Sequence, residues 1–218
     1  VDYDELAAEN ERLRRLLDFR AAHKELQLVA AAVISRDYGT WTNTMVIGAG
    51  SNQGIKENMA VITPDGVVGF ISDAFSDSAR VQLMTDPRTS VGAVVQRPES
   101  RVASVVRGNG NMPLEPQFVN VAKEADILEG DTLITSGFGS IYPKGLYIGK
   151  IVSIHMDDSD FVKYAVIEPG VDFSKLEEVF VITGTSSSNS YDKPDVAPKL
   201  VPQTQRDKVE GVKGAAAL

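Results

Sequence analysis

From Leu26 onward the chain is a succession of short apolar runs rich in β-branched residues, and turn signals separate them. Runs such as MAVIT, GVVGFIS and RVASVVRG alternate with turns such as TPDG and DPRT. Only DFSKLEE, residues 172–178, interrupts them as a possible short helix. Many short strands at close spacing, with almost no helix between them, predict a mainly β protein built as an antiparallel barrel or sandwich.

Two stretches of these strands echo each other. GIKENMAVITPDGVVGFI, residues 54–71, resembles DILEGDTLITSGFGSIYPKGLYIGKI, residues 126–151, except that the second has a longer turn. In both, an apolar strand ends in Ile-Thr, and a turn leads to a glycine and a second apolar strand. The echo indicates two similar β units.

The first 26 residues have a different texture, because they lack Gly and Pro and are rich in the helix formers Ala, Leu, Glu and Arg. Five residues recur at alternating spacings of three and four, the pattern of a coiled-coil seam: Tyr3, Leu6, Asn10, Leu13 and Leu17. A single Asn in such a seam sets register and strand number. We expect a helix that pairs with a second copy, and the alternative is an amphipathic helix packed on its own domain.

Composition excludes several classes of partner and site. The net charge is −8 and no cluster of Lys and Arg occurs, so nucleic acid and anionic membrane surfaces are poor partners. The chain has no cysteine and only two histidines, which excludes disulfides, thiolate metal sites and a three-His zinc site. No apolar run is long enough to span a membrane.

The segment TSGFGSIYPKG, residues 135–145, places serine among glycines and raises the question of a catalytic or phosphate site. A phosphate loop or a nucleophile elbow needs a following helix, whereas GLYIGKI reads as a strand. We therefore interpret the segment as a structural turn, with positive φ at its glycines and a fixed φ at its proline. The residues assigned to this turn are Gly137, Gly139, Pro143 and Gly145.

An envelope serine hydrolase of the chymotrypsin-like type is the alternative function. It would need Ser136 or Ser140 within reach of a histidine and an aspartate. His23 lies on the predicted helix, where we expect it to face solvent, and His155 follows both serines rather than preceding them. Because chymotrypsin-like proteases place the catalytic histidine before the serine in the chain, this order disfavours the hydrolase alternative.

Two further features have a structural and a functional interpretation. Asp157, Asp158 and Asp160 form an acidic cluster that could bind calcium, but it lacks the EF-hand order, and a solvated turn is favoured. Trp41, the single tryptophan, is expected to be a core or loop anchor rather than a platform for a ligand.

The expected domains are a helix at 1–26, a first β-barrel at 27–107, a second at 108–183 whose last strands could return to the first, and a tail at 184–218. The tail is rich in Ser, Pro, Lys and Asp and is expected to be disordered. Its last residues, GAAAL, look like a cloning scar, and the start at Val1 suggests a fragment of a longer protein.

Over residues 5–182 these pieces together resemble the extracytoplasmic part of the MreC family of rod-shape-determining proteins. The family's Glu-Asn and leucines occur here as Glu9, Asn10, Leu13 and Leu17, and its V-x-L-x-T-D element as Val81, Leu83, Thr85 and Asp86. Its remaining elements are found at Gly50, Gly54 and Ile55; Val67, Val68 and Gly69; Gly130, Asp131, Leu133, Thr135, Ser136 and Gly137; Pro143, Gly145, Ile148 and Gly149; and Ala165, Val166, Ile167, Pro169 and Asp172.

This resemblance implies an N-terminal coiled-coil helix followed by two small antiparallel β-barrels of six-stranded type. It also implies a non-enzymatic scaffold without a cofactor, anchored in the bacterial cytoplasmic membrane by a single transmembrane helix and facing outward. The expected partners are further copies of the chain, a penicillin-binding transpeptidase, MreB and MreD, and the implied role is to organise peptidoglycan synthesis during elongation of rod-shaped cells.

Overall fold

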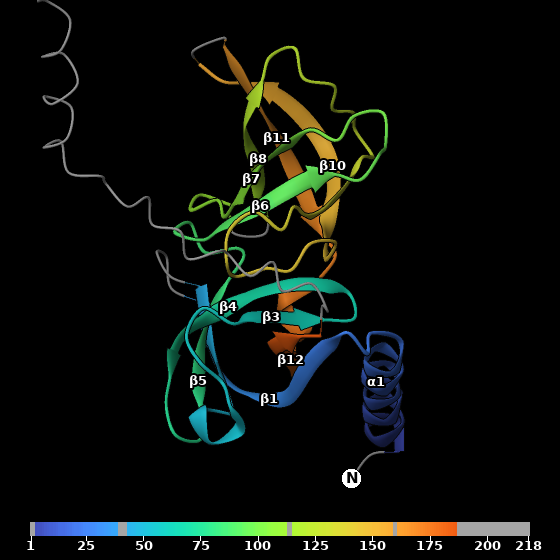
Figure 1. Ribbon diagram of the computed structural model, residues 1–218, viewed down its shortest axis with the longest axis vertical. Helices are drawn as coiled ribbons and strands as arrows, with labels where there is room; N and C mark the ends of the chain where they lie inside the picture. Colours follow the sequence, from blue (N-terminus) through green and yellow to red (C-terminus); the bar gives the residue numbers. More distant parts are fainter. Residues whose placement is uncertain (1–2, 39–42, 113–114, 159–160, 187–218) are drawn as a thin grey trace, which may run out of the picture. The chain divides into compact units, whose positions relative to one another are not determined.

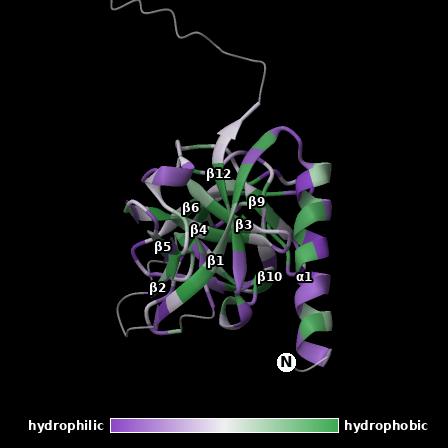
Figure 2. Ribbon diagram, turned by 90° about the horizontal axis from the view of Figure 1, so that it is seen from below, coloured by the Kyte–Doolittle hydropathy of each residue, from purple (hydrophilic) through white to green (hydrophobic). Residues whose placement is uncertain are grey.

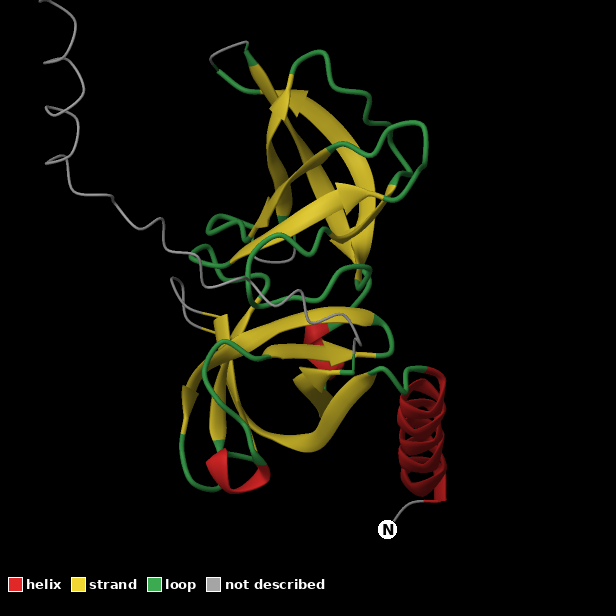
Figure 3. Ribbon diagram, viewed as in Figure 1, coloured by secondary structure: helices red, strands yellow, loops and turns green. Residues whose placement is uncertain are grey.

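The computed structural model describes residues 3–38, 43–112, 115–158 and 161–186. Within them, one long helix precedes two closed six-stranded antiparallel barrels. Figure 3 shows the helix in red and the strands of the barrels in yellow. The mainly β fold with an N-terminal helix and two barrels is therefore confirmed. The expectations for Trp41, Asp160 and residues 187–218 lie outside the described residues. The start of the tail at residue 184 is corrected, because Gly184 and Thr185 belong to the last strand and pair with Gln27 and Leu26.

Helix α1 (Tyr3–Ala22) leads into the first barrel, which is labelled in Figure 1. Around this barrel the strand order is β1-β12-β3-β4-β5-β2. Its strands are β1 (Leu26–Tyr38), β2 (Asn43–Ile47), β3 (Ala60–Thr63), β4 (Gly66–Ala74), β5 (Ala79–Leu83) and β12 (Glu178–Thr185). Two short 3-10 turns, η1 (Ser51–Gln53) and η2 (Phe173–Lys175), lie in its connections.

The second barrel has the order β10-β11-β8-β7-β6-β9. Its strands are β6 (Ser90–Val95), β7 (Ala103–Arg107), β8 (Gln117–Ala122), β9 (Thr132–Thr135), β10 (Tyr147–Met156) and β11 (Val162–Pro169).

The strands divide between the barrels differently from the boundary expected at residues 107 and 108. β6 and β7 belong to the second barrel, and β12 leaves it to close the first by pairing with β1 and β3. The physical reason is that β1 and β3 do not pair with each other, and β12 satisfies both edges by lying between them. The second barrel is thus inserted between β5 and β12 of the first.

Long strands bend at bulges so that one strand can pair with two neighbours. β1 has a bulge between Val33 and Ser35, and it pairs with β12 before this bulge and mainly with β2 after it. A second shift, between Gln27 and Leu28, places its extra residue, Thr183, on β12. β10 has a bulge between Ile151 and Ser153. An extra residue on one strand increases the local bend and twist, which allows a small sheet to close on itself.

The sequence echo corresponds to one hairpin in each barrel. Residues 54–71 form β3 and most of β4, which pair antiparallel, and residues 126–151 form β9 and the first half of β10, which also pair. The longer turn of the second copy is the TSGFGSIYPKG segment. Gly137, Gly139 and Gly145 have φ of 78°, 92° and 95°, a region that residues with a Cβ seldom adopt.

Asp86 is the buried polar centre of the connection between β5 and β6. Its carboxylate accepts hydrogen bonds from the backbone N–H of Asn43 (3.0 Å) and of Arg88 (2.9 Å) and from the Arg88 guanidinium (2.9 and 3.0 Å). Burial opposes the charged form, but these hydrogen bonds outweigh it, so the pKa of Asp86 lies below its ordinary value. One carboxylate thus joins the start of β2 to the chain that leaves the first barrel.

We expect Asp86→Asn to destabilise the protein by about 1–3 kcal/mol at pH 7, because a neutral amide cannot accept all of these hydrogen bonds. A lowered folded-state pKa means that this stabilisation is present above the unfolded pKa of about 4 and is lost as pH falls below it. In urea unfolding, the difference in the free energy of unfolding between the parent and the variant should therefore become smaller toward pH 3. Asp73→Asn, which breaks the exposed pair with Arg80, is the control and should cost less than about 1 kcal/mol. If the difference in the free energy of unfolding between the parent and Asp86→Asn were the same at all pH values, the stabilising role of the ionised Asp86 carboxylate would be contradicted.

Gly137→Ala and Gly145→Ala should each destabilise the fold by about 1–3 kcal/mol, because alanine at these φ values is strained. Gly137→Ala should cost more, since its Cβ would lie 2.9 Å from the Cβ of Lys144, whereas nothing lies near that of Gly145. The matched control is Gly48→Ala, whose Cβ would meet its nearest atom at 3.8 Å. Denaturant midpoints of the three variants test this order, and equal stability of all three would refute it.

Candidate interaction surface

Helix α1 forms for local reasons. Its 20 residues contain no Gly or Pro, Asp4 and Glu5 lie in the first turn, and Arg20 lies in the last turn. Acidic residues at the N-terminus and a basic residue at the C-terminus both complement the helix dipole. Figure 2 shows hydrophobic residues recurring along the whole helix. Some of them are buried and others are exposed, so they belong to two different faces.

One face of α1 packs on the first barrel. Leu16 is its one buried residue, at 8% exposure, and the Phe19 ring lies 6.1 Å from that of Phe180 on β12. The His23 ring stacks on Phe19 at 4.1 Å, and its Nδ1 is hydrogen-bonded to the Phe19 carbonyl at 2.9 Å. His23 is therefore half-buried, and the expectation that it faces solvent is wrong, because the stripe from Leu16 continues to this residue.

Ion pairs hold the same face at its edges. Arg12 contacts Glu177 (2.5 Å) and Glu178 (3.2 Å), and Arg15 pairs with Asp65 in the β3–β4 turn. Burial works against the charge of Arg12, but the two glutamates raise its pKa above the ordinary value. A cavity of about 340 Å³ lies beside these pairs, so the helix is attached through a few contacts rather than a dense core.

The predicted coiled-coil face remains exposed. Leu6, Leu13 and Leu17 are 51%, 43% and 65% exposed, and Asn10 is exposed among them. At about 100° per residue, this face points roughly 120° away from the face of Arg12, Leu16 and Phe19. Packing on its own barrel therefore leaves the seam free, and the two interpretations of the helix are compatible.

The sequence analysis missed the barrel-facing residues. Arg12, Leu16 and Phe19 also follow a spacing of four and three, and His23 extends it. This second stripe could have been found, but its polar first member and the stronger leucine pattern concealed it.

The hydrolase geometry does not assemble among the described residues. Ser136 is buried at 8% exposure, and its Oγ accepts a hydrogen bond from the Phe138 N–H at 3.2 Å. The ring of His155 is bonded through Nε2 to Ser153 Oγ at 2.9 Å, and Ser153 lies two residues away on the same strand. His155 is thus engaged with a residue of its own strand rather than with Ser136 or Ser140.

The acidic turn gathers no metal site within the part of the chain that the structure describes. Asp157 and Asp158 are exposed there, and no group of three acidic or His side chains in the described ranges could hold an ion. In a different turn, the segment of residues 135–145, the buried Tyr142 hydroxyl has no hydrogen-bond partner among the described residues, and its burial raises the pKa of the phenol.

Known proteins share this architecture. Residues 33–183 match the family model described as rod shape-determining protein MreC, barrel core. The cell shape-determining protein MreC of Listeria monocytogenes is 30% identical over 190 residues, which cover 86% of this chain and 64% of that protein. The chain therefore spans somewhat less than two thirds of this relative's length.

Solved structures agree. A structure named MreC superimposes with a TM-score of 0.71 at 28% identity, over 81% of this chain and 98% of the other. The complex between penicillin-binding protein PBP2 and MreC from Helicobacter pylori has a chain that matches with a TM-score of 0.58 at 18% identity, over 72% of this chain and 98% of that one. The second likeness shows the fold alone. The strand order, the family elements and these matches together place the chain in the MreC family of rod shape-determining proteins.

Proposed function

We propose that the chain is the extracytoplasmic part of a non-enzymatic scaffold that maintains rod cell shape by self-associating and by organising peptidoglycan-synthesising enzymes. One observation supports it above the others: α1 is attached to the first barrel by one face, while a second face keeps three leucines and Asn10 exposed. Exposed leucines in a regular stripe are typical of a surface that pairs with another helix.

Membership of the MreC family supports the partners. Because the Helicobacter pylori relative forms a complex with PBP2, we assign a penicillin-binding transpeptidase as a partner of this chain also. MreB and MreD complete the proposed set. No described helix is sufficiently long and apolar to cross a membrane. A single-pass anchor in the bacterial cytoplasmic membrane, with the barrels on its outer face, is part of the proposal.

A parallel helix pair is the geometry that this anchoring favours. Two copies that leave one membrane side by side point the same way, so the two Asn10 side chains meet across the axis. The seam is short, and isolated helices of this length are marginal. Anchoring raises the effective concentration of the helices, so a weak pair in solution becomes a firm one at the membrane.

We expect Asn10→Cys to form a disulfide-linked dimer readily, because an a position of a parallel pair lies next to its copy. The chain has no native cysteine, so the background is zero. Asp18→Cys is the matched control, since it is exposed on α1 but points about 100° or more away from the seam. Non-reducing gels of membrane-anchored protein in cells measure both.

The double variant Leu13→Asp with Leu17→Asp should abolish pairing and leave the barrels folded, since neither leucine is buried in the monomer. Sedimentation measures the association and a thermal melt the fold. Unchanged association of this variant, with no crosslink at residue 10, would show that copies meet through the β surfaces instead.

A further inference from the structure

A groove of about 550 Å³ lies on the outer face of the second barrel, across β7, β8 and β11. Arg107 on β7 is directly opposite Gln117 on β8, and both are outside the barrel core. Asn111, Asn120 and Tyr164 also line the groove. Asn109, Asp157 and Lys163 complete its polar lining, so the groove brings together four amide side chains, one guanidinium, one ammonium, one carboxylate and one phenol, and no residue of α1 lines it.

Four polar side chains of the groove make no hydrogen bond or ion pair within the described structure, whereas Asn109 Oδ1 accepts from the Asn111 N–H at 3.1 Å, and Lys163 and Asp157 also have interactions of their own. Arg107 has no hydrogen-bond or ion-pair partner among the described residues, nor do the side-chain amides of Asn111, Gln117 and Asn120. Arginines elsewhere in the barrels are bonded: Arg80 to Asp73, Arg88 to Asp86 and Arg97 to Asp126 and Asp131. The groove thus presents donors and acceptors to whatever lies in it.

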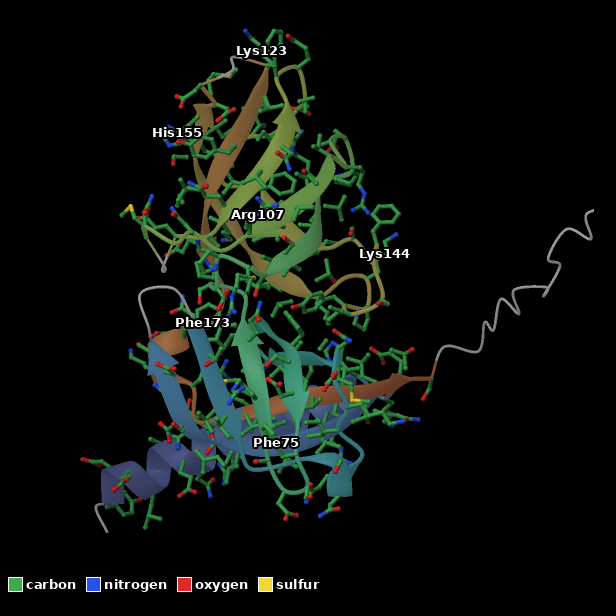
Figure 4. All side chains as sticks on the ribbon, turned by 90° about the vertical axis from the view of Figure 1, so that its left-hand side faces the viewer. Phe75, Arg107, Lys123, Lys144, His155 and Phe173 are labelled. Atoms are coloured by element: carbon green, nitrogen blue, oxygen red, sulfur yellow. The ribbon has the colours of Figure 1, made fainter. Side chains whose placement is uncertain are left out.

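Tyr164 gives the groove a fixed aromatic surface. The ring of His155 stacks on it with centroids 5.3 Å apart and an angle of 28°, and Ser153 Oγ holds His155 Nε2 at 2.9 Å. Figure 4 labels Arg107 and His155 on this barrel. Because the neighbouring strand supports the Tyr164 ring, little side-chain freedom remains to be lost when a ligand packs against it.

The chemistry of the groove disfavours several ligand classes. The barrel is closed, so it offers no strand edge to which an extended peptide could add. Its apolar members, Met112, Val119 and Val162, are interspersed with amides and do not form the continuous strip that a helix needs. Nucleic acid needs more cations than Arg107 and Lys163, and Lys163 already donates to the Ala125 carbonyl at 2.6 Å.

We propose that this groove binds a carboxylated oligosaccharide. Sugar hydroxyls both donate and accept hydrogen bonds, as do the Asn and Gln amides, and the C–H face of a sugar ring can pack on the Tyr164 ring. The unpaired Arg107 guanidinium matches a carboxylate, which it can bind through two parallel N–H···O bonds. The site is separate from the helix seam, and the proposal does not depend on self-association.

The test is an NMR titration of the Leu13→Asp, Leu17→Asp background, so that self-association plays no part. The probes are a hyaluronan tetrasaccharide, which carries carboxylates, and cellotetraose, which is neutral. Both should shift backbone amides of β7, β8 and β11, with millimolar affinity and tighter binding of the carboxylated probe. Tyr164→Ala should weaken the binding of both oligosaccharides by about fivefold or more. Arg107→Gln should weaken only the carboxylated probe and so remove the preference.

Lys150→Ala, an exposed change on β10 outside the groove, is the control and should leave both titrations unchanged. The dispersion of the amide spectrum shows whether each variant is folded. The proposal is overturned if neither probe shifts groove amides at ~10 mM, or if Arg107→Gln weakens both probes equally. It is also overturned if the groove variants abolish binding of a purified transpeptidase and leave both oligosaccharide titrations unchanged, because the groove would then be a protein interface.

Discussion

Closure of the first barrel depends on the pairing of β1 with β12, two strands that are far apart in the sequence: Ala32 pairs with Glu178, and Leu26 pairs with Thr185. β12 inserts between β1 and β3, and without it both strands would be open edges, which invite pairing with other chains. The second barrel is the excursion that the chain makes before β12 returns. Asp86 lies where that excursion begins, and its hydrogen bonds to Asn43 and Arg88 tie the departing chain to β2.

The helix depends on the same closure, because its attachments come from segments that lie next to β12 and β3. Arg12 contacts Glu177 and Glu178, Phe19 packs near Phe180, and Arg15 reaches Asp65. These are few contacts, and exposed ion pairs contribute little individually. The arrangement holds α1 in one orientation and leaves its leucine seam outward, which is the property on which the proposed self-association rests.

Much of this architecture could be predicted from sequence, because strand runs, turn signals and the heptad stripe are local patterns. The echo between residues 54–71 and 126–151 located one hairpin in each barrel, and the positive φ of Gly137 and Gly145 followed from the turn chemistry. The assignment of β6 and β7 to the second barrel could not be predicted in this way, and the return of the last strand to the first barrel could be expected only as one alternative. Which strands close a barrel depends on long-range pairing, and all of these strands have a similar apolar, β-branched composition, so nothing local distinguishes them. The groove around Arg107 was missed for a similar reason, since Gln117 meets Arg107 only through the register of β7 and β8.

The return of β12 also has a consequence for the order in which the protein can form. During synthesis β1 can pair with β2 early, but the first part of β1, residues 26–32, has to wait for β12 until the whole second barrel has been made. The second barrel, whose strands are contiguous in sequence, can close earlier, and local contacts form faster than distant ones. A product that stops before Glu178 would therefore carry a finished second barrel beside an unclosed first one. The first barrel can therefore close only after its last strand, β12, has been synthesised.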